Sequence, residues 1–177
     1  ISQTGDPIDA NSPNITTVEV SPNIGIVKVG STITVTLTDG GSEIGFSNGS
    51  TVTINSKDVS GSFTDNSDGT YDYSYTLVEG DTDWTSGDLP LNIDIQDPSG
   101  NVTTVSAFTD SNTLAGDANS PDVTLVSIPD AAMNVGDIVT ATITVVDDAG
   151  DDYTGGSLSG NIGGFTLTNF TRNTSTT

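Results

Sequence analysis

Apolar and polar residues alternate over several short runs of this chain, which is the pattern of half-buried β-strands. The clearest runs are residues 33–37 (Ile-Thr-Val-Thr-Leu) and residues 71–77, where three tyrosines fall on one face. Turn signals such as Asp39-Gly40-Gly41 and Asn66-Ser67-Asp68-Gly69 separate the runs, and no window has the period of an amphipathic helix. Further strands are predicted over residues 15–20, 51–54, 89–95 and 102–108.

A five-residue motif divides the chain. Asp9-Ala10-Asn11-Ser12-Pro13 returns unchanged 108 positions later as Asp117-Ala118-Asn119-Ser120-Pro121. About seven short strands, with turns every 8–12 residues, follow the first copy, and this spacing is typical of an immunoglobulin-like β-sandwich. We therefore expect an all-β chain of tandem immunoglobulin-like β-sandwich domains, the second one incomplete. The predicted divisions are a linker or tail of a preceding repeat at 1–12, a sandwich at 13–110, a linker at 111–120 and half a sandwich at 121–177.

The second repeat repeats only the first strands of this pattern. Strands are predicted at residues 123–128, 138–146 and 165–167, but counterparts of 71–77, 89–95 and 102–108 do not follow. A half sandwich exposes a strand edge and an apolar face. Either the chain continues past Thr177, which we favour, or a strand from a neighbouring molecule completes the fold by β-augmentation.

The net charge of the chain limits the classes of molecule that it can bind and indicates its cellular location. It has 24 acidic residues against three Lys and Arg, for a formal net charge of −21. Nucleic acids and anionic membrane surfaces are therefore not expected as partners, because both need clustered basic side chains. No apolar stretch approaches the roughly 20 residues of a membrane span. High ionic strength or bound cations would relieve the self-repulsion, and both favour an extracellular location.

The absence of two residue types limits the chemistry. The chain has no Cys and no His, which argues against zinc, copper and haem sites and against Ser-His or Cys-His catalysis. Carboxylate, amide and main-chain oxygens remain, and these are the ligands that calcium takes. We therefore expect Ca²⁺ as the one cofactor and no enzyme activity.

The candidate calcium ligands cluster at the two ends of the first sandwich. Sandwich topology places Asp39 and the turn at residues 97–101 beside the linker that precedes the first strand. At the other end, the acidic loop around residues 79–83 faces the next linker, which also meets the acidic loop of the second repeat. A bound Ca²⁺ would convert repulsion between these carboxylates into cohesion. The predicted ligands are Asp9, Asn11, Asp39, Asp97, Asn101, Asp81, Asp83, Asp117, Asn119, Asp147 and Asp148.

Other interpretations of the same residues stay open. Asp, Asn, Ser and Gly are ordinary turn residues, and a solvated acidic loop needs no ligand. Asp81 and Asp83 form the best pair for a glycosidase acid and base, but a polar loop offers little of the desolvation that raises the pKa of a catalytic acid. Trp84 is more simply an anchor at one end of the sandwich than a platform for a sugar. A carbohydrate-binding module, with a glycan as partner, is the rival hypothesis.

A family resemblance rests on several short motifs taken together. They are the Asp-x-Asn-Ser-Pro linker, the Val-Gly-Ser/Asp entry to the second strand, Asp68-Gly69-Thr70-Tyr71, Glu79-Gly80-Asp81 and Asp97-x-x-Gly100-Asn101. Together they resemble the immunoglobulin-like repeats of large prokaryotic cell-surface proteins, including calcium-dependent giant adhesins and some surface-layer proteins. The resemblance covers nearly all of the first repeat and the first half of the second.

The resemblance implies a function as well as a fold. It implies a structural module at the cell surface, stiffened by calcium at domain junctions, with adjacent repeats or neighbouring copies of the same protein as partners. We favour a surface-layer or filament subunit, and the extender region of a giant adhesin is the alternative. Two departures from the pattern, Ser99 and the difference between Asp39-Gly40-Gly41 and Asp147-Asp148, imply that successive junctions bind calcium unequally.

Overall fold

The computed structural model describes residues 9–146, 160–167 and 171. The chain divides into two compact units, Ile1–Asn119 and Ser120–Thr177, and each is described by itself. Regular structure in the described residues is all-β apart from a single 3₁₀ turn at Ser60–Ser62. No helix of the described part is long and apolar enough to span a membrane.

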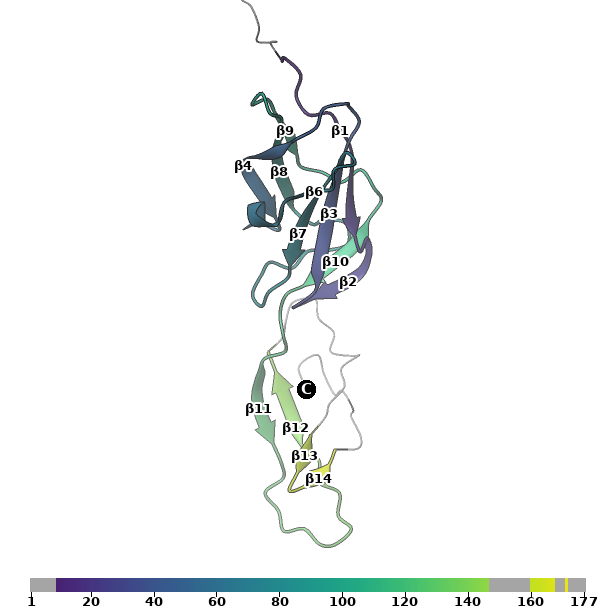
Figure 1. Ribbon diagram of the computed structural model, residues 1–177. Coiled ribbons are helices and arrows are strands. Elements are labelled where there is room, and N and C mark those ends of the chain that lie inside the picture. The colour runs from purple at the N-terminus through teal and green to yellow at the C-terminus, as the bar shows by residue number, and fades with distance from the viewer. Residues whose placement is uncertain (1–8, 147–159, 168–170, 172–177) are drawn as a thin grey trace, which may run out of the picture. The chain divides into compact units, whose positions relative to one another are not determined.

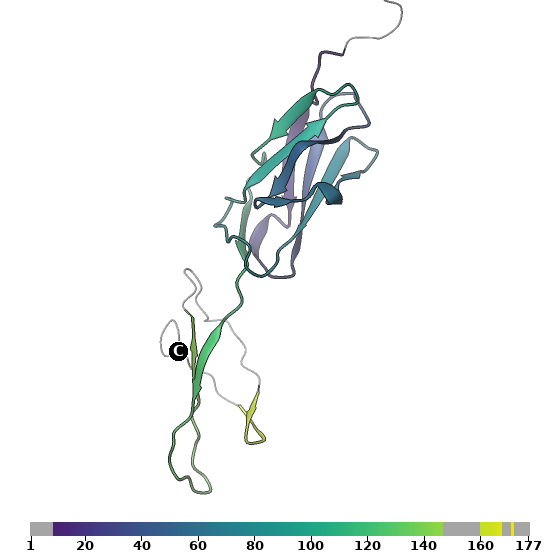
Figure 2. The same cartoon turned by 90° about the vertical axis from the view of Figure 1, so that its left-hand side faces the viewer.

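Two four-stranded antiparallel sheets form the first unit (Figure 1). The first contains β1 (Ile15–Ser21), β3 (Thr32–Asp39), β7 (Thr70–Thr76) and β6 (Thr64–Asp65), in the spatial order β1-β3-β7-β6. The second contains β5 (Lys57–Asp58), β4 (Ser47–Ile54), β8 (Leu91–Gln96) and β9 (Val102–Val105), in the order β5-β4-β8-β9. The two sheets lie as two layers, which Figure 2 shows from the side, and the unit is sandwich-like.

Strand alternation explains how the layers hold together. On β3 the side chains of Ile33, Val35 and Leu37 are buried, while the threonines between them are more exposed. They pack in one apolar core with side chains from the opposite sheet, such as Ile93 and Ile95 of β8. Each such side chain stabilises the fold by roughly 1.5–3 kcal/mol through the apolar surface that it removes from water. The predicted strands at 15–20, 33–37, 51–54 and 71–77 are confirmed.

The tyrosines of β7 lie deeper than a half-buried strand requires. Tyr71, Tyr73 and Tyr75 are at most 4% exposed. The ring of Phe46 stacks on Tyr71 with centroids 5.1 Å apart, and Phe63 lies 5.4 Å from Tyr73. Aromatic residues thus fill the centre of the sandwich, where a chain with 32% hydrophobic residues needs a large apolar area from each side chain.

A third, two-stranded sheet corrects the predicted domain boundary. Strand β10 (Thr113–Asp117) pairs in parallel with β2 (Ile24–Lys28), from Thr113 opposite Ile24 to Asp117 opposite Lys28. The sequence placed residues 113–117 in a linker at 111–120, and that placement is wrong. They belong to the first unit because Leu114 and Ala118 are fully buried in its core.

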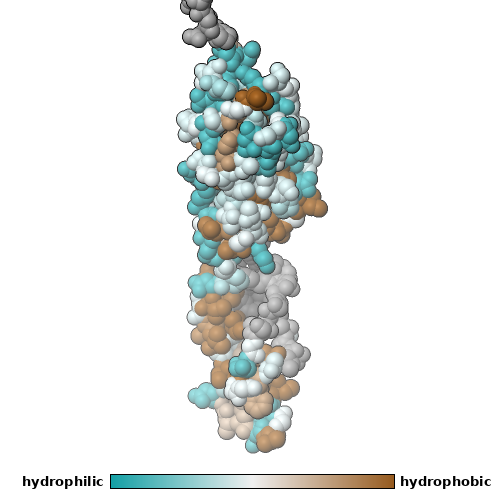
Figure 3. Space-filling model, in the orientation of Figure 1, coloured by the Kyte–Doolittle hydropathy of each residue, from teal (hydrophilic) through white to brown (hydrophobic). Residues whose placement is uncertain are grey.

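The second unit begins as the first does. Strand β11 (Val123–Ser127) pairs antiparallel with β12 (Thr142–Val145), and a short hairpin joins β13 (Asn161–Ile162) to β14 (Phe165–Thr166). The β1–β3 ladder has a bulge between Ile15 and Thr17, and the β11–β12 ladder has one 108 residues later, between Val123 and Leu125. Strand β12 is shorter than the predicted run at 138–146. Apolar side chains of β11, including Leu125 and Val126, are more than half exposed, and Figure 3 shows brown patches in this part of the chain.

Candidate functional site

Three carboxylates meet at one end of the first unit. Asp9, Glu43 and Asp97 each present an oxygen, and these oxygens all lie within 4.8 Å of one another. Asp9 comes from the segment before β1, Glu43 from the loop between β3 and β4, and Asp97 from the turn between β8 and β9. Within the described part of the chain, this is the one group of three or more potential metal-ligating acidic residues so close together.

Asp97 is the fixed member of this cluster. It is 2% exposed, and its Oδ1 accepts hydrogen bonds from the N–H groups of Ser99 at 2.8 Å and Asn101 at 2.9 Å. Its Oδ2 accepts a third hydrogen bond, from Asn101 Nδ2 at 2.8 Å. Gly100 completes the tight turn with φ of 95°, a conformation that glycine adopts without steric cost. Turn chemistry therefore explains the position of Asp97, as the alternative interpretation expected.

The linker residues are attached to the same end. Asn101 Nδ2 donates to the main-chain oxygen of Asp9 at 3.4 Å, and Thr103 Oγ1 donates to the main-chain oxygen of Pro13 at 2.6 Å. The Asp9 carboxylate accepts the N–H of Asn11 at 3.1 Å, which closes an Asx turn. The structure thus brings Asp9, Asp97 and Asn101 together, as sandwich topology predicted.

A shared hydrogen bond and the surrounding charges shift the pKa values of Glu43 and Asp9 in opposite directions. A hydrogen bond shared with Asp9 raises the pKa of Glu43, and burial and the negative charges of Asp9, Asp97 and Asp39 raise it further. The pKa of Asp9 is lowered by the Asn11 N–H and by side-chain hydrogen bonds with Glu43 and Ser99. The pair therefore shares one proton more readily than isolated carboxyls do. A divalent cation competes for the same oxygens.

Two other predicted ligands lie at the edge of this cluster. Asp39 acts on Glu43 through its charge, and its own Oδ1 is buried without a hydrogen-bond partner among the described residues. Asn11 is exposed, and its N–H closes the Asx turn. The sequence prediction omitted Glu43 as a ligand. The available signal was its place four residues after Asp39 in an acidic turn.

At the opposite end of the first unit, hydrogen bonds join the acidic loop to the second copy of the linker motif. Asp83 Oδ1 accepts the N–H of Ala118 at 2.7 Å, and Asp83 Oδ2 accepts Asn119 Nδ2 at 3.0 Å. Asp117 accepts the N–H of Asn119 at 3.1 Å in an Asx turn of its own. The predicted meeting of the acidic loop with this linker is therefore present for Asp83 and Asn119. The predicted ligands Asp147 and Asp148 lie outside the described residues.

Asp81 forms an ion pair with the side chain of Lys57. Its carboxylate is 2.7 Å from Lys57 Nζ and accepts hydrogen bonds from Tyr75 Oη at 2.6 Å and the Val78 N–H at 3.0 Å. Burial raises the pKa of Asp81, but the Lys57 contact and these hydrogen bonds outweigh it and lower the pKa to about 2. A general acid needs the opposite shift. Burial and the Asp81 contact raise the pKa of Tyr75 to about 12.

Trp84 is an anchor at this end of the sandwich. It is 6% exposed, and its main chain exchanges two hydrogen bonds with Gly116, at 3.0 and 3.1 Å. Its ring is 6.5 Å from that of Tyr75. The ring is therefore buried, which is what the anchor interpretation expects and which leaves little surface for stacking on a sugar.

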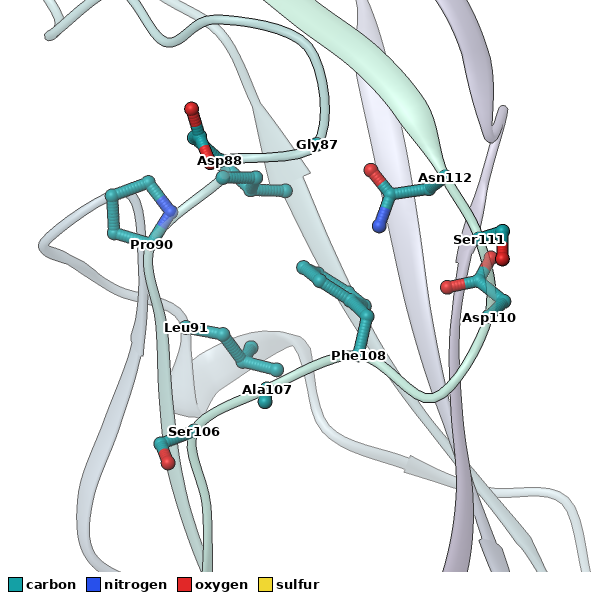
Figure 4. A pocket seen from close by; sticks show the side chains of 11 residues that line it. Gly87, Asp88, Pro90, Leu91, Ser106, Ala107, Phe108, Asp110, Ser111 and Asn112 are labelled. Carbon is teal, nitrogen blue, oxygen red and sulfur yellow. The ribbon is translucent and has the colours of Figure 1, made fainter.

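A groove of about 590 Å³ opens on another part of the first unit. Figure 4 shows the Phe108 side chain between Leu91 on one side and Asn112 on the other. Asp88 and Asp110 also line the groove, and none of the three clustered carboxylates does.

Comparison with models of protein families, with curated proteins and with solved structures finds no match for this chain.

Proposed function

We propose that this chain is a structural module of an extracellular prokaryotic surface assembly, built from tandem immunoglobulin-like sandwiches that calcium stiffens. The observation that carries the proposal is the strand order. If the eight sandwich strands are lettered in chain order, with β5 as an extra C′ strand, the two sheets read A-B-E-D and C′-C-F-G. This is the arrangement of constant-type immunoglobulin domains, with one added edge strand.

The repeat supports an array of such domains. The second unit follows the second copy of the linker motif, and its first ladder carries a bulge at the same 108-residue offset. Domains joined in series by short linkers span distance and transmit force, because each contacts only its neighbours. A role as a spacer or assembly unit follows from that organisation.

Calcium is the cation that best fits the carboxylate cluster. Asp9, Glu43 and Asp97 supply three carboxylates, and nearby main-chain and amide oxygens would complete the six to eight ligands that Ca²⁺ takes. The cluster joins the segment before β1 to two loops of the sandwich. A cation bound there would therefore fix the direction in which the chain enters the domain.

A surface-layer or filament subunit and an adhesin extender remain the two forms of this proposal. The excess of negative charge, −21 overall, supports the first, because it suits a coat that concentrates cations outside the cell. The carbohydrate-binding alternative has lost its main support, since Trp84 is buried.

Electron microscopy of the purified full chain with millimolar Ca²⁺, and again with EDTA, tests the proposal. Ordered sheets or filaments that appear with calcium and disperse with EDTA support the surface-layer form. Extended particles that remain separate, and that become more uniform in length with calcium, support the extender form. Compact particles that are unaffected by calcium contradict both.

A further inference from the structure

The two copies of the linker motif, residues 9–13 and 117–121, form the same turn but use different atoms to bind the first unit. We call each copy the connector. In both copies the asparagine N–H donates to the aspartate Oδ1 two residues earlier, at 3.1 Å in each case. Both copies therefore contain the same Asx turn, although Asp117 also ends strand β10, where it lies opposite Lys28.

The second copy is bound through N–H groups of Ala118 and Asn119, through the Ala118 carbonyl and through burial of the alanine side chain. Asp83 accepts hydrogen bonds from the Ala118 N–H at 2.7 Å and from Asn119 Nδ2 at 3.0 Å. The Gly80 N–H donates to the main-chain oxygen of Ala118 at 2.9 Å. Ala118 is fully buried. Gly80 and Asp83 of the loop at residues 80–84 thus bind the main chain at Ala118, whose side chain belongs to the core of the first unit.

The first copy is bound through its carbonyl groups. Asn101 donates to the main-chain oxygen of Asp9 at 3.4 Å, and Thr103 donates to that of Pro13 at 2.6 Å. Ala10 and Asn11 are exposed. Among the described residues, neither the Ala10 N–H nor the Asn11 side-chain amide has a hydrogen-bond partner.

The two sets of atoms do not overlap, so one connector can make both sets of bonds at once. We propose that the connector joins two domains of this kind end to end. Its alanine and its asparagine bind the 80–84 loop of the preceding domain, and the carbonyls of its aspartate and its proline bind Asn101 and Thr103 of the following one. The partner of the exposed Ala10 and Asn11 is therefore the 80–84 loop of another copy of this domain. The inference rests on the proposed function for the array, but it needs no calcium.

A chain with a duplicated first domain tests this proposal. Residues 1–119 are followed directly by residues 12–177, so that one connector lies between two complete domains and the whole natural chain is retained. Residual dipolar couplings are measured in EDTA. The proposal predicts a single alignment frame for both domains. Two independent frames in EDTA would overturn it, and if calcium then merged the frames, the calcium-stiffened array would stand without the connector.

Matched substitutions identify the bonds responsible. In the first domain of this chain, Asp83→Ala is expected to speed exchange of the Ala118 amide hydrogen by about tenfold or more, because a charge-assisted hydrogen bond is lost, and to separate the two frames. Asp88→Ala removes a carboxylate five residues further along the chain, which bonds Thr85 and not the connector, and should do neither. Thr103→Val in the second domain should separate the frames while both domains remain folded. A single frame in both the Asp83 and the Thr103 variants would overturn the proposal.

Discussion

The ring of Trp84 lies against the backbone of Gly116, so close that no side chain fits at that position. A Cβ on Gly116 would fall well inside the contact distance of three carbons of the indole. The main chains of the two residues exchange hydrogen bonds at 3.0 and 3.1 Å. This contact joins the acidic loop to β10 and thereby closes one end of the sandwich.

Replacing Gly116 should therefore destabilise the first unit. We expect Gly116→Ala to lower the free energy of unfolding by about 1–3 kcal/mol, the usual cost of an added methyl group in a packed site. Gly61→Ala is the control, because a Cβ there meets nothing within 4 Å. Urea denaturation of both variants measures the difference, and equal midpoints would contradict the contact.

The fluorescence of the single tryptophan reports on the same contact. Because Trp84 is 6% exposed, acrylamide and iodide should quench the folded protein weakly and the unfolded protein strongly. Added sugars should leave the emission unchanged. Strong quenching of the folded state would show that the ring is accessible, and a response to sugar would restore the carbohydrate hypothesis.

The Lys57–Asp81 ion pair should matter more than a surface pair. The Lys57 side chain is half exposed, but that of Asp81 is 1% exposed, so Lys57→Gln leaves a buried carboxylate without its cation. We expect a loss of about 1–3 kcal/mol, less than for a fully buried pair because water reaches the lysine side. Lys28→Gln, at an exposed position, is the control. Equal stability of the two variants would contradict the argument.

The low pKa of Asp81 should make the first unit less stable in acid. Its pKa is about 2 in the folded protein and about 3.9 in an unfolded chain. A depressed folded pKa stabilises the fold fully above about pH 4, and that contribution is lost as the pH falls through 4 towards 2. Chemical denaturation between pH 2 and 7 should show this slope in the wild type and a smaller one in Asp81→Asn. An unchanged slope would assign the loss of stability in acid to other carboxylates.

The sequence predicted most of what alternation and turn residues determine. Period-2 runs located β1, β3 and β7, and the order of strands in a sandwich placed Asp9 beside Asp97 and Asn101. Strand β10 was missed because Thr113–Asp117 contains Ala and Gly, has no period, and pairs with a strand nearly 90 residues earlier.

Individual partners of the acidic residues were harder to predict than their locations. Asp81 and Asp83 are two residues apart, and the sequence grouped them as ligands of one ion. In the structure Asp81 turns inward to Lys57, while Asp83 binds the backbone of the linker. Only the path of the loop around Trp84 separates these roles, and that path depends on Gly116, which is more than thirty residues away in the chain.

Binding of Ca²⁺ to the cluster of Asp9, Glu43 and Asp97 is tested by thermal unfolding at pH 7, with millimolar Ca²⁺ and with EDTA. The proteins compared are the wild type, Glu43→Gln and, as a control, the exposed Glu19→Gln. Calcium at 100 times its Kd adds about 2.7 kcal/mol, or about 10 °C in Tm, and we expect this rise in the wild type and the control.

Glu43→Gln should be more stable than the wild type in EDTA and less stable than the wild type in calcium. In EDTA it removes one of three mutually repelling carboxylates, so its Tm should exceed that of the wild type, and with calcium it should lose most of the rise. We therefore expect the Tm values of the wild type and Glu43→Gln to cross between EDTA and calcium. A wild-type Tm that calcium does not change, or a full calcium-dependent rise in Glu43→Gln, would contradict this expectation.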